Sequence, residues 1–132
     1  MKWTIEYFEQ EDTTQPAELF EDELARIYPK IRGKLIHITD LLLVEGYHLG
    51  GGLIEKCHSY KGVWEIRVIH SGTLARELFG FDGERIVLLH GYLKRTGEPA
   101  SQRDLKKAAD YWKDYQKTRC VRPVQEEETA NE

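Results

Sequence analysis

The stretch GVWEIRVIHSGTLARELFGFDGERIVLLHGYLKRT, residues 62–96, decides the fold. Three runs within it are rich in β-branched, aromatic and other apolar residues, and turn-forming residues separate them. The second break contains Asp82-Gly83, a dipeptide that strongly favours a tight hairpin turn. We therefore expect an antiparallel meander, with strands at 63–69, 74–81 and 84–93.

Alternation along the first of these strands sorts its side chains onto two faces. One face carries Trp64, Ile66 and Val68, and the other carries Val63, Glu65, Arg67 and Ile69. The third strand contains the nearly continuous apolar run 86–89, which indicates a strand covered on both faces. Such a sheet needs packing partners from elsewhere in the chain.

Two amphipathic helices precede this stretch. Apolar residues recur at helical spacing from Ala17 to Tyr28, and Pro29 is expected to break or re-aim the helix. A second helix is expected to continue to Glu45, where Gly46 is a plausible cap. The resulting hairpin has one apolar side, which must cover a sheet.

Three further segments complete the predicted domain. Residues 3–8 are rich in β-formers and predict a first strand at the edge of the sheet. Residues 47–62 contain the triple glycine 50–52 and predict a long, flexible connection. Ser101, with Asp104 three residues later, resembles a capping box that opens a final helix. The apolar stripe of that helix consists of Leu105, Ala108, Ala109, Trp112 and Tyr115.

The predicted order of elements is therefore β-α-α-β-β-β-α. This is an α+β domain in which an antiparallel meander is packed by an N-terminal helical hairpin, with a C-terminal helix. We expect the domain to span residues 1–117. The remaining residues, 118–132, form an acidic tail that we expect to be disordered.

Composition supports a single cytoplasmic domain. A chain of 132 residues with 40% hydrophobic and 32% charged residues is typical of a globular protein. No apolar run approaches the length of a membrane span or a signal peptide. The two cysteines, Cys57 and Cys120, lie far apart and are expected to be free thiols in a reducing cytoplasm. No spacing of histidines and cysteines suggests a metal site, and we expect no cofactor.

The net charge of −4 conceals an uneven distribution. Residues 1–59 carry 6 basic and 11 acidic side chains, whereas residues 60–120 carry 12 basic and 8 acidic ones. The last twelve residues are acidic again. The basic second half is compatible with a surface that binds phosphate groups.

Several blocks of this chain resemble the phage-derived HigB-like toxins of the RelE superfamily. The strand GVWEIRV, 62–68, resembles their LWELR strand, and IVLLHGYLKRT, 86–96, resembles their IVLLHGFxKKT segment. Arg76 stands where the family has an arginine that opens the next strand. Pro99 and a helix that ends in DYWKDY, 110–115, follow in the family's order. The resemblance covers about residues 17–117, and it implies a RelE-like fold.

The resemblance implies the toxin of a type II toxin–antitoxin system. Such a toxin is a metal-independent endoribonuclease that cleaves mRNA, in many relatives only in the ribosomal A site, and so inhibits translation and arrests growth. The 2′-hydroxyl of the RNA attacks the adjacent phosphate. The implied partners are mRNA, the ribosome and a cognate helix-turn-helix antitoxin of the HigA type. A heterotetramer with the antitoxin is compatible with this resemblance, as is an origin in a prophage.

Basic residues on neighbouring strands are the first candidates for the catalytic site. Guanidinium groups match phosphate oxygens bidentately, so Arg67 and Arg76 are predicted to clamp the reacting phosphate. Lys94 and Arg95 are predicted to support them or to contact RNA. The alternative is a solvated sheet face on which the two arginines pair with Glu65 and Glu77. In either case Glu77 is expected to place an acid near this site.

Proton transfer requires further groups. His90 and His70 are candidates because imidazole titrates near neutral pH. Tyr92, on the same strand face as His90 and Lys94, is a candidate for orienting the ribose or stacking on a base. Packing is the alternative role for His90 and Tyr92.

Two other classes of function are compatible with this sequence. The first is a non-catalytic module with the same fold that binds RNA or a protein. The second is a phage-derived structural or assembly protein, for which no residue of the chain argues directly.

Overall fold

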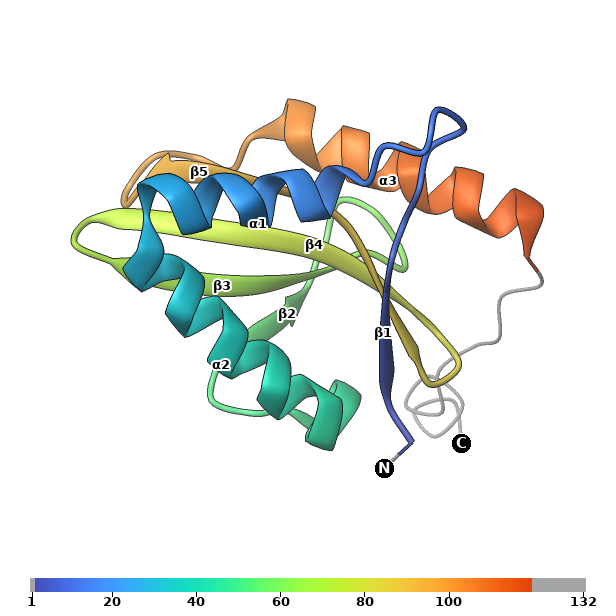
Figure 1. Cartoon of the computed structure of the whole chain (residues 1–132), viewed down its shortest axis with the longest axis horizontal. Helices are drawn as coiled ribbons and strands as arrows, with labels where there is room; N and C mark the ends of the chain where they lie inside the picture. Colours follow the sequence, from blue (N-terminus) through green and yellow to red (C-terminus); the bar gives the residue numbers. More distant parts are fainter. Residues whose placement is uncertain (1, 120–132) are drawn as a thin grey trace.

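The computed structural model describes residues 2–119 and has three α-helices and one five-stranded sheet (Figure 1). The strands are β1 (Thr4–Tyr7), β2 (Ile54–Lys56), β3 (Trp64–His70), β4 (Thr73–Asp82) and β5 (Arg85–Arg95). The helices are α1 (Pro16–Ile27), α2 (Pro29–Glu45) and α3 (Gln102–Thr118), with a short 3-10 turn, η1 (Gly46–His48). The protein is thus an α+β domain.

The sheet is mixed, and the prediction of a purely antiparallel sheet was wrong. Its strand order is β1-β5-β4-β3-β2, and β3, β4 and β5 form the predicted antiparallel meander. β1 lies at the edge as predicted, but it runs parallel to β5, with Thr4 opposite Arg85 and Tyr7 opposite Leu88. The alternating pattern predicts which residues share a face of the sheet, but it does not predict which strands pair when they are far apart in the sequence. The direction of β1 relative to β5 could therefore not be predicted from the sequence pattern.

The connection between α2 and β3 is more regular than predicted. It contains η1 and the second edge strand β2, whose Ile54 pairs with Ile66 of β3. Three residues are too few to show an alternating pattern, so the long glycine-containing loop concealed this strand.

The helix boundaries follow local signals in the sequence. Pro29 is the first residue of α2, where the missing amide hydrogen costs nothing. Gly46 ends α2 with a positive φ of 58°. Ser101 caps α3, because its hydroxyl accepts a hydrogen bond from the backbone of Asp104.

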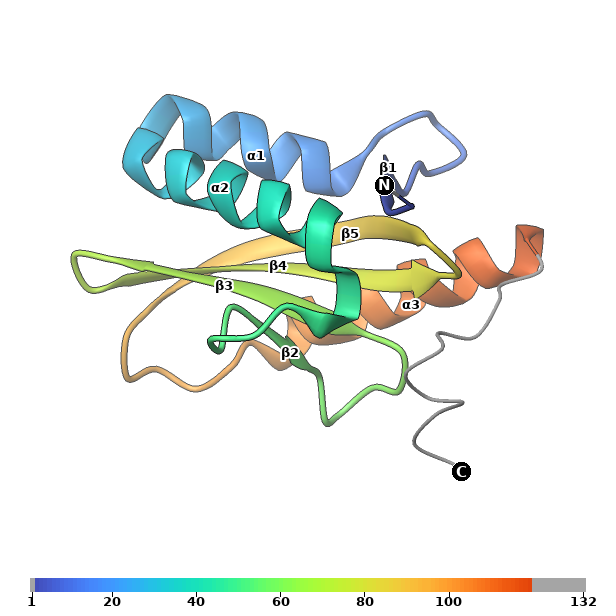
Figure 2. The same cartoon turned by 90° about the horizontal axis from the view of Figure 1, so that it is seen from below.

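The sheet lies between two layers of helices. Figure 2 shows α1 and α2 above the sheet and α3 below it. The core under α1 and α2 includes Leu24, Leu35, Ile66, Phe79 and Leu88. The core under α3 is a second cluster that includes Leu78, Val87, Leu89, Leu105 and Trp112. The apolar run in β5 is therefore buried on both faces, as predicted.

Two glycines let the helices approach the sheet closely. A Cβ atom on Gly91 would lie 2.1 Å from the Phe20 ring of α1. A Cβ atom on Gly80, on the other face, would lie 2.7 Å from the Trp112 ring of α3. These positions fix where each helix crosses the central strands.

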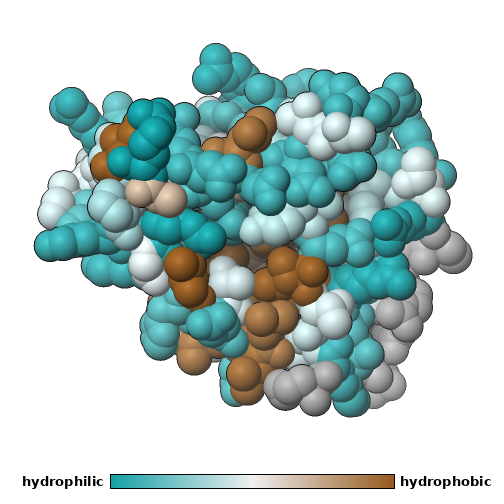
Figure 3. All heavy atoms as spheres, in the orientation of Figure 1, coloured by the Kyte–Doolittle hydropathy of each residue, from teal (hydrophilic) through white to brown (hydrophobic). Residues whose placement is uncertain are grey.

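Some large apolar side chains remain exposed on the helices. On the face shown in Figure 3, hydrophobic residues lie between hydrophilic ones, and most of them are in the lower half of the view. Ile36 and Val44 of α2 and Leu19 of α1 are among the exposed ones. Within residues 2–119, no helix combines the length and the apolarity needed to cross a membrane. The predicted tail, 118–132, lies outside the described residues from position 120 onward.

Candidate functional site

Arg67, Arg76 and Tyr92 lie in one row across three adjacent strands. Arg67 of β3 is directly opposite Arg76 of β4, and Arg76 is directly opposite Tyr92 of β5. Their side chains point away from α1 and α2, because the alternate residues Ile66 and Val68 pack under those helices. The predicted convergence of the two arginines on one face of the sheet is therefore present.

Glu65 joins the two arginines. One of its carboxylate oxygens lies 3.4 Å from Nη1 of Arg76, and the other lies 3.8 Å from Nε of Arg67. Nη1 of Arg76 also donates to the hydroxyl oxygen of Tyr92 at 3.5 Å. Glu55 of β2 accepts a 2.9 Å hydrogen bond from Arg67 at the rim. We call Glu65, Arg67, Arg76 and Tyr92 the arginine–glutamate cluster.

The cluster is partly closed to solvent. The side chain of Glu65 is only 8% exposed and that of Arg76 only 14%, whereas Arg67 is 33% exposed. The Nε atoms of both arginines are buried and make no hydrogen bond with a described residue. The arginines thus keep unused donors close to a partly open surface, and a ligand with oxygen acceptors would reach these donors after the side chains rearrange.

Burial changes the proton affinities in the cluster. It raises the pKa of the Glu65 carboxyl above the usual value, although Arg76 and Arg67 pull that pKa down. Burial also raises the pKa of the Tyr92 hydroxyl, against the opposing effect of Arg76. Glu65 is therefore a stronger proton acceptor than an exposed glutamate, and Tyr92 stays protonated at neutral pH.

The side chains of Lys94 and Arg95, at the end of β5, point to opposite faces of the sheet. Lys94 is near enough to Glu65 to lower its pKa, and its Nζ donates to the backbone carbonyl of Glu98. Arg95 follows in the strand and therefore points to the opposite face. Its side chain is exposed, and its backbone amide donates to the carboxylate of Glu98. Of this predicted pair, the structure brings only Lys94 to the arginine–glutamate cluster.

Glu77 does not belong to this site, and the prediction that it places an acid there was wrong. It lies between Ile66 and Gly91 in the register, on the face that α1 and α2 cover, and is only 1% exposed. Burial, followed by the neighbouring Glu21, raises the pKa of its carboxyl well above the usual value. Arg76 and Glu77 are consecutive in one strand and so point to opposite sides.

The sequence of this chain matches the model of a known protein family. The family described as "Phage derived protein Gp49-like (DUF891)" matches residues 22–113, from the first helix to the last. The chain belongs to this Gp49-like family. This is a toxin-like family of the RelE/HigB superfamily, so the resemblance seen in the sequence is confirmed at that level. No curated protein matches the chain, and the finer assignment to HigB-like toxins stays a prediction.

In this Gp49-like protein His90 is tied to the start of α3. Its Nε2 lies 2.8 Å from Oδ1 of Asp104, whose other oxygen accepts from the Ser101 hydroxyl at 2.6 Å. These hydrogen bonds overcome the effect of burial and lower the pKa of Asp104. A register shift between Leu78 and Phe79 turns both Leu89 and His90 of the opposite strand toward α3.

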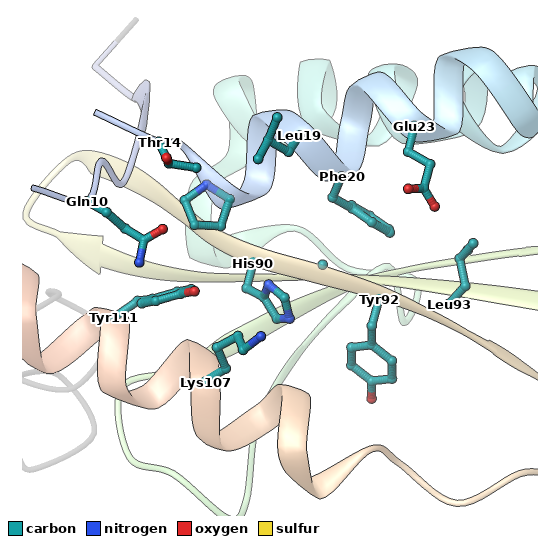
Figure 4. Close-up of a pocket in the computed structure, with 12 residues that line it drawn as sticks. Gln10, Thr14, Leu19, Phe20, Glu23, His90, Tyr92, Leu93, Lys107 and Tyr111 are labelled. Atoms are coloured by element: carbon teal, nitrogen blue, oxygen red, sulfur yellow. The ribbon is translucent and has the colours of Figure 1, made fainter. Parts of the chain in front are cut away.

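His90 also borders a pocket of about 430 Å³ between β5, α1 and α3. In Figure 4 its ring lies beside Lys107 and Tyr111, Tyr92 extends from the same side of the strand, and Phe20 occupies the other side. The contact with Asp104 joins His90 to the start of α3. His90 is not in contact with Arg67 or Arg76 in any described interaction.

His70 lies away from the cluster. It lines a groove between α2 and the edge of β3, together with His37 and Lys30. The sequence placed His70 in a turn beside the basic face, but the end of β3 directs it toward α2.

Sequence reasoning named Glu65 only in the alternative in which the arginines pair with carboxylates, and the structure places it between Arg67 and Arg76. The signal was present, because alternation puts Glu65 on the same face as Arg67. The partners Glu55 and Asp104 carried no such signal, since their positions depend on β2 and on the docking of α3. Among residues 2–119, no group of three or more His, Cys, Asp or Glu side chains is arranged to hold a metal ion.

Proposed function

We propose that this Gp49-like protein is the toxin of a type II toxin–antitoxin system and cleaves mRNA on the ribosome as a metal-independent endoribonuclease. The observation that carries the proposal is the arginine–glutamate cluster, in which two arginines and a buried tyrosine surround one buried carboxylate. Membership of a toxin-like, phage-derived family supports it.

The cluster contains the groups that transesterification of RNA requires. The 2′-oxygen attacks the adjacent phosphorus, the bond from phosphorus to the 5′-oxygen breaks, and a 2′,3′-cyclic phosphate and a 5′-hydroxyl form. Arg67 and Arg76 would leave Glu65 in part and bind the phosphate oxygens, whose charge grows in the transition state.

The two proton transfers fall to Glu65 and Tyr92. Glu65 accepts the proton of the 2′-hydroxyl, because burial has made it a stronger base. Tyr92 keeps its proton at neutral pH and stands beside Arg76, so it can pass that proton to the departing 5′-oxygen. Lys94 adds positive charge along the path of the RNA backbone.

A cleavage assay tests this function. The purified protein is added to ribosomes that carry a defined mRNA, and the ends of the fragments are mapped. We expect 5′-hydroxyl and cyclic-phosphate ends, and a loss of about 10²–10³-fold in rate for Arg76→Ala, the size seen when one transition-state donor is removed. Arg26→Ala, at an exposed arginine in the last turn of α1, is the matched control. Intact mRNA with the unaltered protein would refute the nuclease.

The partners follow from the same proposal. We predict a helix-turn-helix antitoxin encoded next to this gene, which binds the toxin in the cytoplasm and assembles with it into a heterotetramer. Expression of the toxin alone should arrest growth, and co-expression of the neighbour should relieve the arrest. Normal growth in both cases would contradict a toxin–antitoxin pair.

A non-catalytic RNA- or protein-binding module is the second candidate. The observation in its favour is that both arginines are already paired with carboxylates, Arg67 with Glu55 and Arg76 with Glu65. Retention of mRNA on the protein without new RNA ends would support this candidate.

A further inference from the structure

A groove separates α2 from the outer edge of β3. Its volume is about 740 Å³. One wall is a stripe of α2 at spacings of three and four residues, and the other is the last half of β3. The floor is apolar and is formed by Ile38, Leu41, Leu53 and Val68.

The strand that borders this groove has a free edge. β4 pairs with β3 along its whole length, from Trp64 to His70, whereas β2 pairs only with residues 64–66. The amide of Arg67 still reaches the carbonyl of Leu53, at 3.1 Å. Beyond it no described strand continues the sheet, so the last three residues of β3 present an open edge. Such an edge pairs readily with an added strand.

The backbone groups at this edge are positioned for pairing. Nζ of Lys34 donates to the carbonyl of Ile69 at 3.1 Å, which shows that this carbonyl points outward. In an antiparallel ladder the amide of the same residue points the same way. The side chain of Ile69 is 53% exposed, so an apolar surface lies beside these groups.

The rim of the groove is positively charged. Lys30 and Lys34 line it with His37 and His70, and no acidic residue is among its lining residues, whereas the Arg67 side chain is directed to Glu55 and Glu65. The α2 side of this edge therefore attracts carboxylates, while the exposed Ile69 side chain on the other face favours apolar side chains. These demands alternate in the way that the side chains of an extended strand do.

We propose that this groove binds an extended segment of a partner protein, in which apolar residues alternate with aspartate or glutamate, as an additional strand on β3. The carboxylates of the segment face α2 and take the ammonium group of Lys34 from the Ile69 carbonyl, while its apolar residues lie beside the Ile69 side chain on the other face. The segment's backbone then bonds to that carbonyl. The site is separate from the arginine–glutamate cluster except at Arg67, so it does not depend on RNA cleavage.

A defined peptide tests the proposal. The probe is a seven-residue peptide that alternates valine and glutamate, with both ends blocked, titrated into the full chain labelled with ¹⁵N. We expect the amide signals of residues 67–70 to shift and hydrogen exchange at the Ile69 amide to slow. A peptide with lysine in place of each glutamate should bind much more weakly.

Two charge reversals provide the matched comparison. Lys34→Glu, at an exposed position on the rim, should weaken binding of the probe by about tenfold or more. Lys113→Glu makes the same change in net charge on an exposed position of α3 and should leave binding unchanged. Equal binding by both variants would overturn the proposal.

Three further results would also overturn it. The first is equal affinity for the lysine peptide, and the second is confinement of the shifts to Arg76 and Tyr92. The third involves the chain's own acidic end, residues 126–128, which could compete for the groove. If changing these three glutamates to glutamine shifted the signals of residues 67–70 and strengthened probe binding, the occupant would be this chain's own segment.

Discussion

Glu65 and Glu77 lie on adjacent strands, yet they occupy opposite faces of one sheet. Glu65 sits among two arginines and a tyrosine on the partly open face. Glu77 is sealed under α1 and α2, where Glu21 and Arg32 are the charged groups that act on it. Burial raises the pKa of both carboxyls, but only Glu65 has cations in direct contact.

The difference shows how one residue type serves two purposes. A carboxyl beside arginines can hold its charge and still be a stronger base than usual, which suits proton transfer near a phosphate. A carboxyl in an apolar layer tends to bind a proton instead and contributes mainly to packing and to the pH dependence of stability. Four substitutions test this contrast.

Glu65→Gln should nearly abolish cleavage. The amide keeps the size of the carboxyl but cannot accept the proton, so we expect the single-turnover cleavage rate to fall by about 100-fold or more. Glu55→Gln, at the exposed rim, should have a much smaller effect. A melting temperature close to that of the unaltered protein would show that the lower cleavage rate comes from the missing base and not from unfolding. An unchanged rate would exclude Glu65 as the base.

Glu77→Gln should alter stability and leave cleavage intact. The raised pKa of Glu77 means that the folded state binds a proton which the unfolded state has released above its own pKa, near 4.5. The free energy of unfolding contributed by Glu77 is therefore greatest below that pH and falls as pH rises toward the folded-state pKa. Glutamine should flatten this part of the profile, measured by denaturant titration from pH 4 upward. A profile identical to that of the unaltered protein would contradict a protonated Glu77.

Gly91→Ala should destabilise the packing on the Glu77 side. The added Cβ would lie 2.1 Å from the Phe20 ring, so α1 has to move, and overpacking of this kind costs about 1–3 kcal/mol. Gly33→Ala, in α2 with no atom within 4 Å of the new Cβ, is the control and should be neutral or stabilising. Chemical denaturation measures both. Equal stability of the two variants would mean that α1 does not press on β5.

Ser101→Ala should have the smallest effect, on the opposite face. It removes the cap of α3 and one hydrogen bond to Asp104, at a cost of about 1 kcal/mol in the free energy of unfolding. Because that hydrogen bond also helps to lower the pKa of Asp104, the variant should lose less stability than the unaltered protein as pH falls below 4. Ser59→Ala, in the exposed loop before β3, should change neither quantity. Equal free energies of unfolding for the Ser101→Ala and Ser59→Ala variants would contradict a stabilising cap at Ser101.

Part of this candidate site could be predicted from the sequence. Period-two alternation put Arg67 and Arg76 on neighbouring strands and on one face, because backbone geometry fixes side-chain direction within a strand. The same rule puts Glu65 on the face of Arg67, and it puts Glu77 on the face opposite Arg76. The roles of His90 and His70 could not be predicted, because they depend on a register shift in β4–β5 and on the position of α2.

The sequence by itself determined the local elements of this protein. Pro29, Gly46, Asp82-Gly83 and Ser101 act within a few residues, so the helix boundaries, the tight hairpin and the three-stranded meander followed from them. Tertiary structure alone decided the parallel pairing of β1, the addition of β2 and the free edge of β3 beside α2. These depend on contacts between residues far apart in the chain, whose free energy comes from burying both helix layers on one sheet rather than from any local preference.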